Sequence, residues 1–539
     1  MNTSNLSKSN KIVKRVLIGV AIVVAVVAVV AVGGMVLSRV ASKKLHTALA
    51  DIPGVRIDFK GMNFSPILGN LEFRDVEIAI QDNTNAGSQI EGRIKAIKLE
   101  RLSWKSLTHG EASAKRLVIR EPEVQMILTG KKAAEKKDTA GTSPEASFLK
   151  KVSLSELRVE KGQIGLNSQK NPMKVSAQGI TCSVRDIGFL LAENQFEYND
   201  SCYAFAVDSL DYIDVTGLSR IQMAHLATAD AGPVKAQAMH LYNTVSQEQV
   251  AERMGKVAAM WYDVKIDSMT TSPLNIPRMV QNERVEIDSI YLAGPDITLF
   301  QDDRYPPAVP YATLQEGLNT LDMPLLIKRI DARVKAFTFI WETTHINRGT
   351  FPLHNLRLSI SSVSNAPNNL MKMGLKSGSD KDGHLDFSLL IRNNKQESTQ
   401  GHMKISGLDA SRLDDFVRPL FGATAKADIH QIDCTFKGDK HQMTEDFCML
   451  YDNLKLHAWN DISAPYKIVS KNSGFISFLA NLAVPSSNPS KPGKDPKKVE
   501  VTFERDPMTP YPAYIIQNLT MGMLRTVLPG GAVHKNNKK

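Results

Sequence analysis

The chain has 539 residues, which is too long for one compact hydrophobic core, so we expect two or more domains or one elongated body. Apolar residues make up 42% and charged residues 23%, which excludes global disorder and a polytopic membrane protein. Aromatic residues at 6% and four cysteines exclude a disulfide-packed mini-domain and a protein with several zinc sites. The net charge of +10 comes from the N-terminal flank, two polar linkers and the tail, and this distribution argues against nucleic-acid binding.

The first element is a membrane anchor. Residues 16–38 (VLIGVAIVVAVVAVVAVGGMVLS) carry no charge and are long enough to cross a hydrocarbon core of about 30 Å. A cleaved signal peptide is the alternative, but its apolar region is usually shorter and basic residues follow this run. More basic residues precede the run than directly follow it, so the positive-inside rule places residues 1–15 in the cytoplasm and exports the body.

From residue 51 onward, apolar and polar residues alternate with a period of two, which predicts a mainly β chain with a few short helices. In residues 70–80 (NLEFRDVEIAI) the alternation slips by one position at Arg74 and Asp75, which indicates a bulge or kink. One face of each strand is apolar. Such faces either pack together in a closed sandwich or line an open groove, and the pattern leaves both possible.

The strand pattern repeats. An offset of 173 residues aligns Pro122 with Pro295 and matches the apolar positions around them. A similar offset aligns residues 180–184 with residues 356–360, so we expect two copies of one β unit over roughly 94–190 and 264–363.

Four segments have helical patterns: residues 246–261, 311–321, 410–420 and 513–527, the last an amphipathic closing helix. Two polar, breaker-rich segments, residues 130–146 and 485–498, are predicted to be exposed loops. The resulting organisation is a first β unit, a second β unit, a C-terminal β region with its closing helix, and a flexible tail, over residues 45–245, 246–400, 401–528 and 529–539.

The cysteines fall into two pairs that flank predicted hairpin turns, Cys182 with Cys202 and Cys434 with Cys448. In an exported body each pair could form a cross-strand disulfide, and two pairs of buried free thiols are the equal alternative.

No motif for a nucleophile elbow, a zinc protease, a phosphate-binding loop or a dinucleotide fold occurs. The segment with Asp380, Asp382, Gly383 and Asp386 resembles a calcium loop but lacks carboxylates at the first and twelfth positions, so a hairpin turn is favoured. We therefore expect no enzyme, no cofactor and no metal.

Several segments resemble the AsmA-like proteins of bacterial envelopes. They follow the N-terminal span and are GNLEFRDVEI (69–78), KAIKLERLSWKSL (95–107), KRLVIREPEVQM (115–126), LSELRVEKGQI (154–164) and HMKISGLDASRLDDFVRPLFG (402–422). The resemblance implies an inner-membrane anchor, a body in the periplasm and an elongated, curved antiparallel β-groove related to bridge-like lipid transfer proteins.

For function, the resemblance implies binding or conduction of lipid in outer-membrane biogenesis or lipid homeostasis. The expected partners are phospholipid or another acyl-chain lipid, the inner membrane and an envelope protein. The residues expected to line the groove are Leu117, Ile119, Val124, Met126, Ile180, Val184, Ile290, Leu292, Ile297, Leu299, Leu356 and Leu358.

Two other functions compete with lipid binding. The first is a scaffold that recruits an envelope assembly partner by adding a strand to an exposed sheet edge. The second is an envelope enzyme with a site that shows no known motif, which a polar pocket with perturbed carboxylates would indicate.

Overall fold

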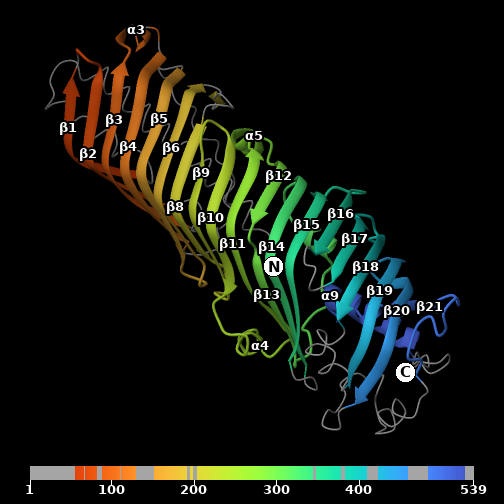
Figure 1. Ribbon diagram of the computed structural model, residues 1–539. Coiled ribbons are helices and arrows are strands. Elements are labelled where there is room, and N and C mark those ends of the chain that lie inside the picture. The colour runs from red at the N-terminus through yellow and green to blue at the C-terminus, as the bar shows by residue number, and fades with distance from the viewer. Residues whose placement is uncertain are drawn as a thin grey trace. The chain divides into compact units, whose positions relative to one another are not determined.

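The structure is a computed structural model (Figure 1). It describes residues 55–65, 67–81, 88–107, 109, 111–128, 151–190, 195–197, 203–343, 348–377, 383–409, 423–458 and 484–527. These residues form two compact units. Unit 1 holds the described residues up to His240 together with Thr270–Asn282, and unit 2 holds Leu241–Met269 and the described residues from Glu283 onward.

Unit 1 is built on strands that pair mostly with their neighbours in the sequence. The hydrogen-bonded order is β1–β2–β3–β4–β5–β6–β8–β9–β10, and β7 pairs with one end of β6. Two short helices, α3 (Trp104–Leu107) and α5 (Ile276–Gln281), belong to this unit. The strands are β1 (Val55–Ser65), β2 (Asn70–Gln81), β3 (Ser88–Leu102), β4 (Glu111–Leu128), β5 (Lys151–Ser168), β6 (Lys174–Leu190), β7 (Gln195–Glu197), β8 (Tyr203–Ile213), β9 (Ser219–Thr228) and β10 (Pro233–Asn243).

Unit 2 continues the same kind of sheet. Strand β11 pairs with β13, β12 and β13 pair with successive halves of β14, and the order then follows the sequence from β14 to β21. Its helices are α4 (Val250–Arg253), α6 (Leu314–Asn319) and α9 (Tyr511–Val527). The strands are β11 (Ala259–Pro273), β12 (Val285–Ala293), β13 (Asp296–Asp303), β14 (Leu325–Thr343), β15 (Gly349–Ser364), β16 (Leu370–Ser377), β17 (His384–Arg392), β18 (Thr399–Asp409), β19 (Ala423–Gly438), β20 (Gln442–Ala458) and β21 (Lys498–Glu504).

The prediction of a mainly β fold with few helices is confirmed, but the expectation of a purely antiparallel sheet is wrong. Strand β4 pairs with β5 in parallel, and so do β12 and β13 with β14. In both places a long connection, residues 129–150 or 304–324, lies between the paired strands. A connection of that length lets the chain cross back and start the next strand from the same edge.

These parallel pairs occur once in each of the two segments that the sequence repeat relates. In each copy a long strand precedes a short helix, then a strand interrupted at a proline, then a parallel strand, then an antiparallel one. Pro122 interrupts the pairing of β4, and Pro295 lies between β12 and β13. The residues before these prolines, Glu121 and Gly294, both have positive φ, of 46° and 65°. The repeat is therefore one of backbone geometry as well as of apolar pattern.

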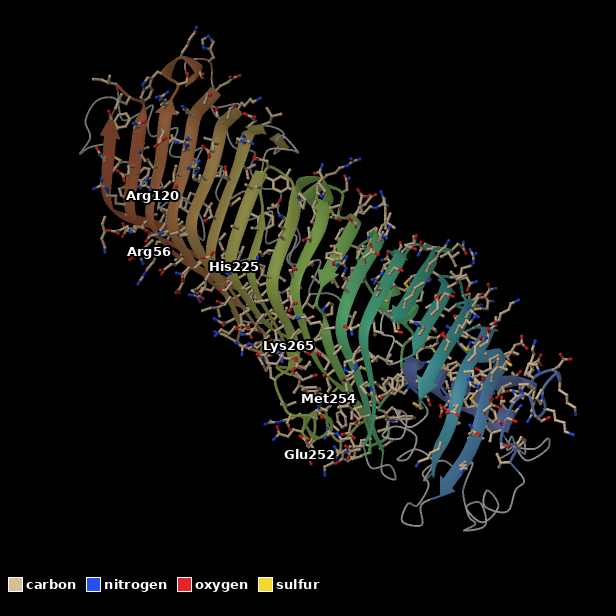
Figure 2. All side chains as sticks on the ribbon, viewed as in Figure 1. Arg56, Arg120, His225, Glu252, Met254 and Lys265 are labelled. Atoms are coloured by element: carbon tan, nitrogen blue, oxygen red, sulfur yellow. The ribbon has the colours of Figure 1, made fainter. Side chains whose placement is uncertain are left out.

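The slip in alternation predicted at Asp75 belongs to a row of interruptions that crosses unit 1. Strand pairing skips Asp75 between β2 and β3, Glu121 between β3 and β4, and Lys161 between β4 and β5. All three have positive φ, and the long strands bend along their length (Figure 1). Gly179 in β6 and His225 in β9, the latter labelled in Figure 2, continue the row with φ of 66° and 51°.

The helix predicted over residues 246–261 is wrong for most of its length. Only Val250–Arg253 is helical, and Trp261 lies in β11 opposite the buried Phe300. Gly255 has a φ of 89°, which ends the helix because this conformation is incompatible with helical continuation. The pairing of Trp261 with β13 therefore outweighs the helical periodicity of the segment. Glu252 in α4 and Met254, which follows the helix, are exposed (Figure 2).

Two other predicted helices occur with shifted bounds. The segment 311–321 contains α6, where Thr313 and Glu316 form a capping box. The closing helix is α9, which begins two residues before the predicted start. The predicted helix 410–420 lies outside the described residues.

Several predicted segments also lie outside the described residues: the membrane anchor 16–38, the cytoplasmic segment 1–15, the loop 130–146 and the tail 529–539. Within the described part of the chain, no helix combines the length and the apolar character needed to cross a bilayer. The loop 485–498 is exposed over most of its length, but Asn488 is buried and its amide donates to the carbonyl oxygen of Met449 at 2.7 Å.

We predict that the row of positive-φ residues sets the local fold of unit 1. In Gly179→Ala, the new Cβ would lie 2.0 Å from a carboxylate oxygen of Asp208 at a φ unfavourable for alanine. We expect a loss of about 1–2 kcal/mol in the free energy of unfolding, measured by urea denaturation. The matched variant Ala238→Gly, at a φ of 45° in the same unit, should lose no stability. Equal effects of the two substitutions would contradict the argument.

Candidate functional site: a continuous apolar face

The candidate site in unit 1 is the apolar face of its sheet. Cross-strand pairing aligns apolar side chains into rows on both sides of the bend. On one side the directly paired residues are Leu71, Leu99, Leu117, Leu157, Val184 and Tyr203. On the other side they are Ile78, Gly92, Val124, Ile164, Ala177, Leu210 and Met223.

The opposite face of the same strands is charged. Arg116 donates to Glu156 at 2.6 Å, and Lys98 pairs with Glu100 at 2.7 Å. Burial alone would raise the pKa of Glu156, but hydrogen bonds from Arg116 and Arg158 hold that pKa below its ordinary value. These carboxylates therefore stay ionised, and the face stays solvated while the other face is apolar.

Burial along the apolar face of unit 1 is uneven. Near β1–β5 its side chains form a tight cluster, in which Leu99 and Leu117 are each 3% exposed. On β6, β8 and β9 the described apolar side chains are half-buried, Tyr203 excepted. Ile164 on β5, beyond the bend, is 48% exposed. The face is thus closed at its β1 side and accessible farther along.

Unit 2 carries an apolar face of the same design. A single row of directly paired residues runs from β12 to β21, and it consists of Leu292, Ala332, Leu358, Leu375, Phe387, Met403, Cys434, Phe447 and Val499. Beyond the bend, Val264, Ile297 and Phe337 pair in the same way. The face again spans the whole set of strands.

All twelve residues that the sequence predicts for a groove lie on these two faces. Leu117 and Leu356 are buried, and the other ten are half-buried. Within each unit the predicted residues lie on strands that flank a shared neighbour, for example Leu117 of β4 and Val184 of β6, which both pair with Leu157 of β5. Unit 1 and unit 2 each contain a separate set.

Sequence reasoning missed the part of the face on β8 and β9. Phe205, Leu210 and Tyr212 of β8 pair directly with predicted or equivalent apolar positions of β6. The signal was present, because YAFAVDSLDYI (Tyr203–Ile213) alternates with one slip at Asp208. It was overlooked because this segment has no counterpart in the sequence repeat.

The end of the apolar face in unit 2 is covered by α9. Tyr514 and Val527 of this helix are buried in one cluster with Phe447 and Met443 of β20. The Tyr514 hydroxyl donates to the carbonyl oxygen of Phe503 on β21 at 2.9 Å. The predicted closing helix thus packs on the last strands of the sheet, where the apolar side chains are most deeply buried.

One acidic residue lies in this buried end. Glu445 occupies an apolar-face position between Phe436 of β19 and Val501 of β21, and it is 1% exposed. Burial raises the pKa of Glu445 to about 7, although the interactions with Cys434 and Arg525 act to lower this pKa. Any Cβ at Gly522 of α9 would lie 2.4 Å from the carboxylate, so only glycine lets the helix approach this closely.

Of the two alternatives for Cys434 and Cys448, a disulfide or two free thiols, the structure has the free thiols. Cys434 pairs with Phe447 and is buried on the apolar face, whereas Cys448 pairs with Asp433. This one-residue offset puts the two side chains on opposite faces of the sheet. Cys182 is a free, half-buried thiol opposite Phe205, and Cys202 lies outside the described residues.

Among the described residues, no group of three or more histidine, cysteine or acidic side chains could hold a metal ion. One surface hollow beside the bend of unit 1 has a volume of about 590 Å³ and is lined by paired charges such as Lys95 and Glu121, 2.8 Å apart. The two apolar faces offer a surface for non-covalent binding of apolar groups.

Comparisons with known proteins add no family. No family model and no curated protein matches the sequence. Among solved structures, the crystal structure of Pseudomonas aeruginosa OccK8 (OprE) aligns with a TM-score of 0.12 and 6% identity, over 74% of this chain and 87% of that chain. A TM-score this low carries no argument about the fold or the function.

We predict that Glu445 makes the stability of unit 2 depend on pH. Its pKa is higher in the folded chain, about 7, than its ordinary value of 4.5, so the folded state binds the proton more tightly. The stability that this proton contributes is complete below about pH 4.5 and is lost as the pH rises through about 7.

Glu445→Gln should remove this pH dependence and raise the urea midpoint at pH 8, because a neutral amide avoids the cost of a buried charge. Glu500→Gln, on the exposed face of the neighbouring strand, is the matched control and should change neither. A Glu445→Gln variant that keeps the wild-type pH profile between pH 5 and 8 would assign the dependence to another group.

Proposed function

We propose that this protein is a membrane-anchored periplasmic protein of AsmA type that binds or conducts lipid on the apolar faces of its two β units, in outer-membrane biogenesis or lipid homeostasis. One observation carries the proposal. The apolar rows run from β2 to β9 in unit 1 and from β12 to β21 in unit 2, yet their middle parts are half-buried. A face that is continuous, apolar and accessible supports binding of long hydrocarbon chains.

The energetics favour such a ligand. Burying apolar surface contributes about 25 cal/mol per Å², or roughly 0.8 kcal/mol for each methylene. An acyl chain of about a dozen methylenes would therefore gain on the order of 10 kcal/mol from complete burial. No catalytic or metal-binding group is required for this binding.

The geometry of the rows suits a ligand that lies across the strands. The rows of unit 1 pass over seven strands from β2 to β9, which at a spacing of about 4.8 Å extend for roughly 29 Å. A chain along such a row contacts side chains from several strands. Removal of one methyl-bearing side chain would weaken binding only slightly, so a decisive test must introduce a charge.

The anchor and the compartment rest on the sequence. The uncharged segment 16–38 and its flanking basic residues favour a single-pass anchor with the body exported, and the AsmA-like segments favour the inner membrane and the periplasm. In this position the accessible apolar faces would meet lipid leaving or entering a membrane.

We expect Val124→Asp to abolish lipid association in unit 1. Val124 is half-buried between Gly92 and Ile164, so an aspartate there places a charge in the path of the acyl chain without removing a buried core residue. The adjacent Gln125→Asp places the same charge on the exposed face and is the control. The measurement is native mass spectrometry of the body, released without detergent at a protease site inserted after Lys44.

The corresponding pair in unit 2 is Leu358→Asp and Ser359→Asp, on the apolar and the exposed face of β15. Phospholipid at near-integer stoichiometry in wild type and in both controls, and its loss from the variants of the apolar face, is the expected outcome. Equal lipid in Val124→Asp and Gln125→Asp would remove the face of unit 1 from consideration. A monodisperse wild-type body free of lipid would instead favour the strand-addition scaffold.

A further inference from the structure

The turn between β1 and β2 exposes two large aliphatic side chains at the edge of unit 1. Ile67 is 96% exposed and Leu68 is 62% exposed. Both lie on one short turn, and Ile67 has the highest exposure among the described large hydrophobic residues. Adjacent exposed Ile and Leu side chains are unfavourable in water, so this turn needs a specific explanation.

The turn is held firmly in this outward position. The amide of Leu102 donates to the carbonyl oxygen of Gly69 at 2.8 Å, and the amide of Arg101 donates to the side chain of Asn70 at 3.0 Å. Gly69 has a φ of 62°, and a Cβ there would lie 2.6 Å from the carbonyl oxygen of Leu102. The end of β3 therefore fixes the turn, and Ile67 and Leu68 do not fold back onto the sheet.

A tryptophan and two cations lie at the same edge. Helix α3 follows β3 directly and lies above the arrowhead of β3, at the end of the strands to which the arrowhead of β1 also points (Figure 1). Its Trp104 packs edge-to-face on Phe64 at the end of β1, with the ring centroids 6.1 Å apart. Arg101 and Lys105 flank Trp104 and are exposed. Exposed aliphatic residues beside a tryptophan and basic side chains are the composition of a segment that lies in a bilayer interface.

The charge at this edge is positive. Besides Arg101 and Lys105, the start of β4 contributes the acidic Glu111, and its partner at the start of β5 is the basic Lys151. The outermost described charges of this edge, which are Arg101, Lys105, Lys151 and Glu111, thus carry a net positive charge, and Glu100 behind them is paired with Lys98 and Arg116. Such an edge is attracted to anionic phospholipids and not to a neutral apolar partner.

We propose that the turn residues Ile67 and Leu68, together with α3, insert into the interface of an anionic phospholipid bilayer, the membrane that holds the segment 16–38. The proposal rests on the anchor of the proposed function and not on its lipid-binding face. Residues 39–54 link the two, and when extended they reach about 55 Å. Strand β1, with 11 residues, is about 36 Å long, so the turn at its far end can return to the anchoring membrane.

The test places the photo-crosslinking residue p-benzoylphenylalanine at position 67 of the full chain, reconstituted in vesicles of phosphatidylcholine and phosphatidylglycerol. The matched control carries it in place of Val309, which is 68% exposed in unit 2. We expect a phospholipid adduct at position 67 and little at position 309. Charge reversal by Arg101→Glu with Lys105→Glu should lower the adduct roughly tenfold, and so should vesicles of phosphatidylcholine alone.

Two further measurements separate the bilayer from lipid held on the apolar face. Solubilisation in detergent before irradiation should abolish the adduct at position 67, and Val124→Asp should leave it unchanged. Vesicle flotation of the reconstituted chain tests the anchor independently of the adduct. Absence of an adduct at position 67, or an equal adduct at position 309, would overturn the proposal, and so would persistence of the adduct in detergent.

Discussion

The fold depends on one constraint: each bent strand must keep its apolar side chains on one face across the bend. Successive side chains of a strand point to opposite faces, so the residues beyond a bend keep the same face only if the alternation shifts there by one position. A residue with positive φ, as at Asp75, makes this shift, and the register between β2 and β3 is the same on both sides of it. Phe73 and Val76 are three residues apart and yet both are buried on the same face. The bend and the continuous apolar rows therefore have the same cause.

Many of these positive-φ positions are occupied by residues other than glycine. Glu121 and Lys161 adopt positive φ at a cost of about 1–2 kcal/mol each. Their side chains stay on the exposed side, where Glu121 forms an ion pair with Lys95. A glycine at each of these positions would relieve the strain but would also remove side chains that keep the outer side of the bend hydrated. The row of positive-φ residues thus separates a charged outer face from an apolar one.

The sequence predicts the strands, their apolar faces and the repeat, because all three follow from local alternation and from the prolines at positions 122 and 295. It does not predict the parallel pairs, since parallel and antiparallel pairing give the same alternation within a strand. It also fails at residues 246–261, where the helical pattern is real but Trp261 gains more from pairing with Phe300. Whether Cys434 and Cys448 could form a disulfide depended on the register of β19 and β20. Because Cys448 pairs with Asp433 and not with Cys434, the two thiols lie on opposite faces of the sheet.

The candidate site was predictable for the same reason as the strands, but its accessibility was not. Whether an apolar face is closed or open depends on what packs on it. In unit 2, α9 covers one end of the face, and no described element covers the predicted positions Leu358 and Ile297. A closed sandwich would bury all of these residues. Half-burial of a continuous apolar face leaves an unfavourable hydration free energy that folding alone has not removed. A ligand that covers the face recovers this free energy, and a hydrocarbon chain does so without requiring any polar group from the protein.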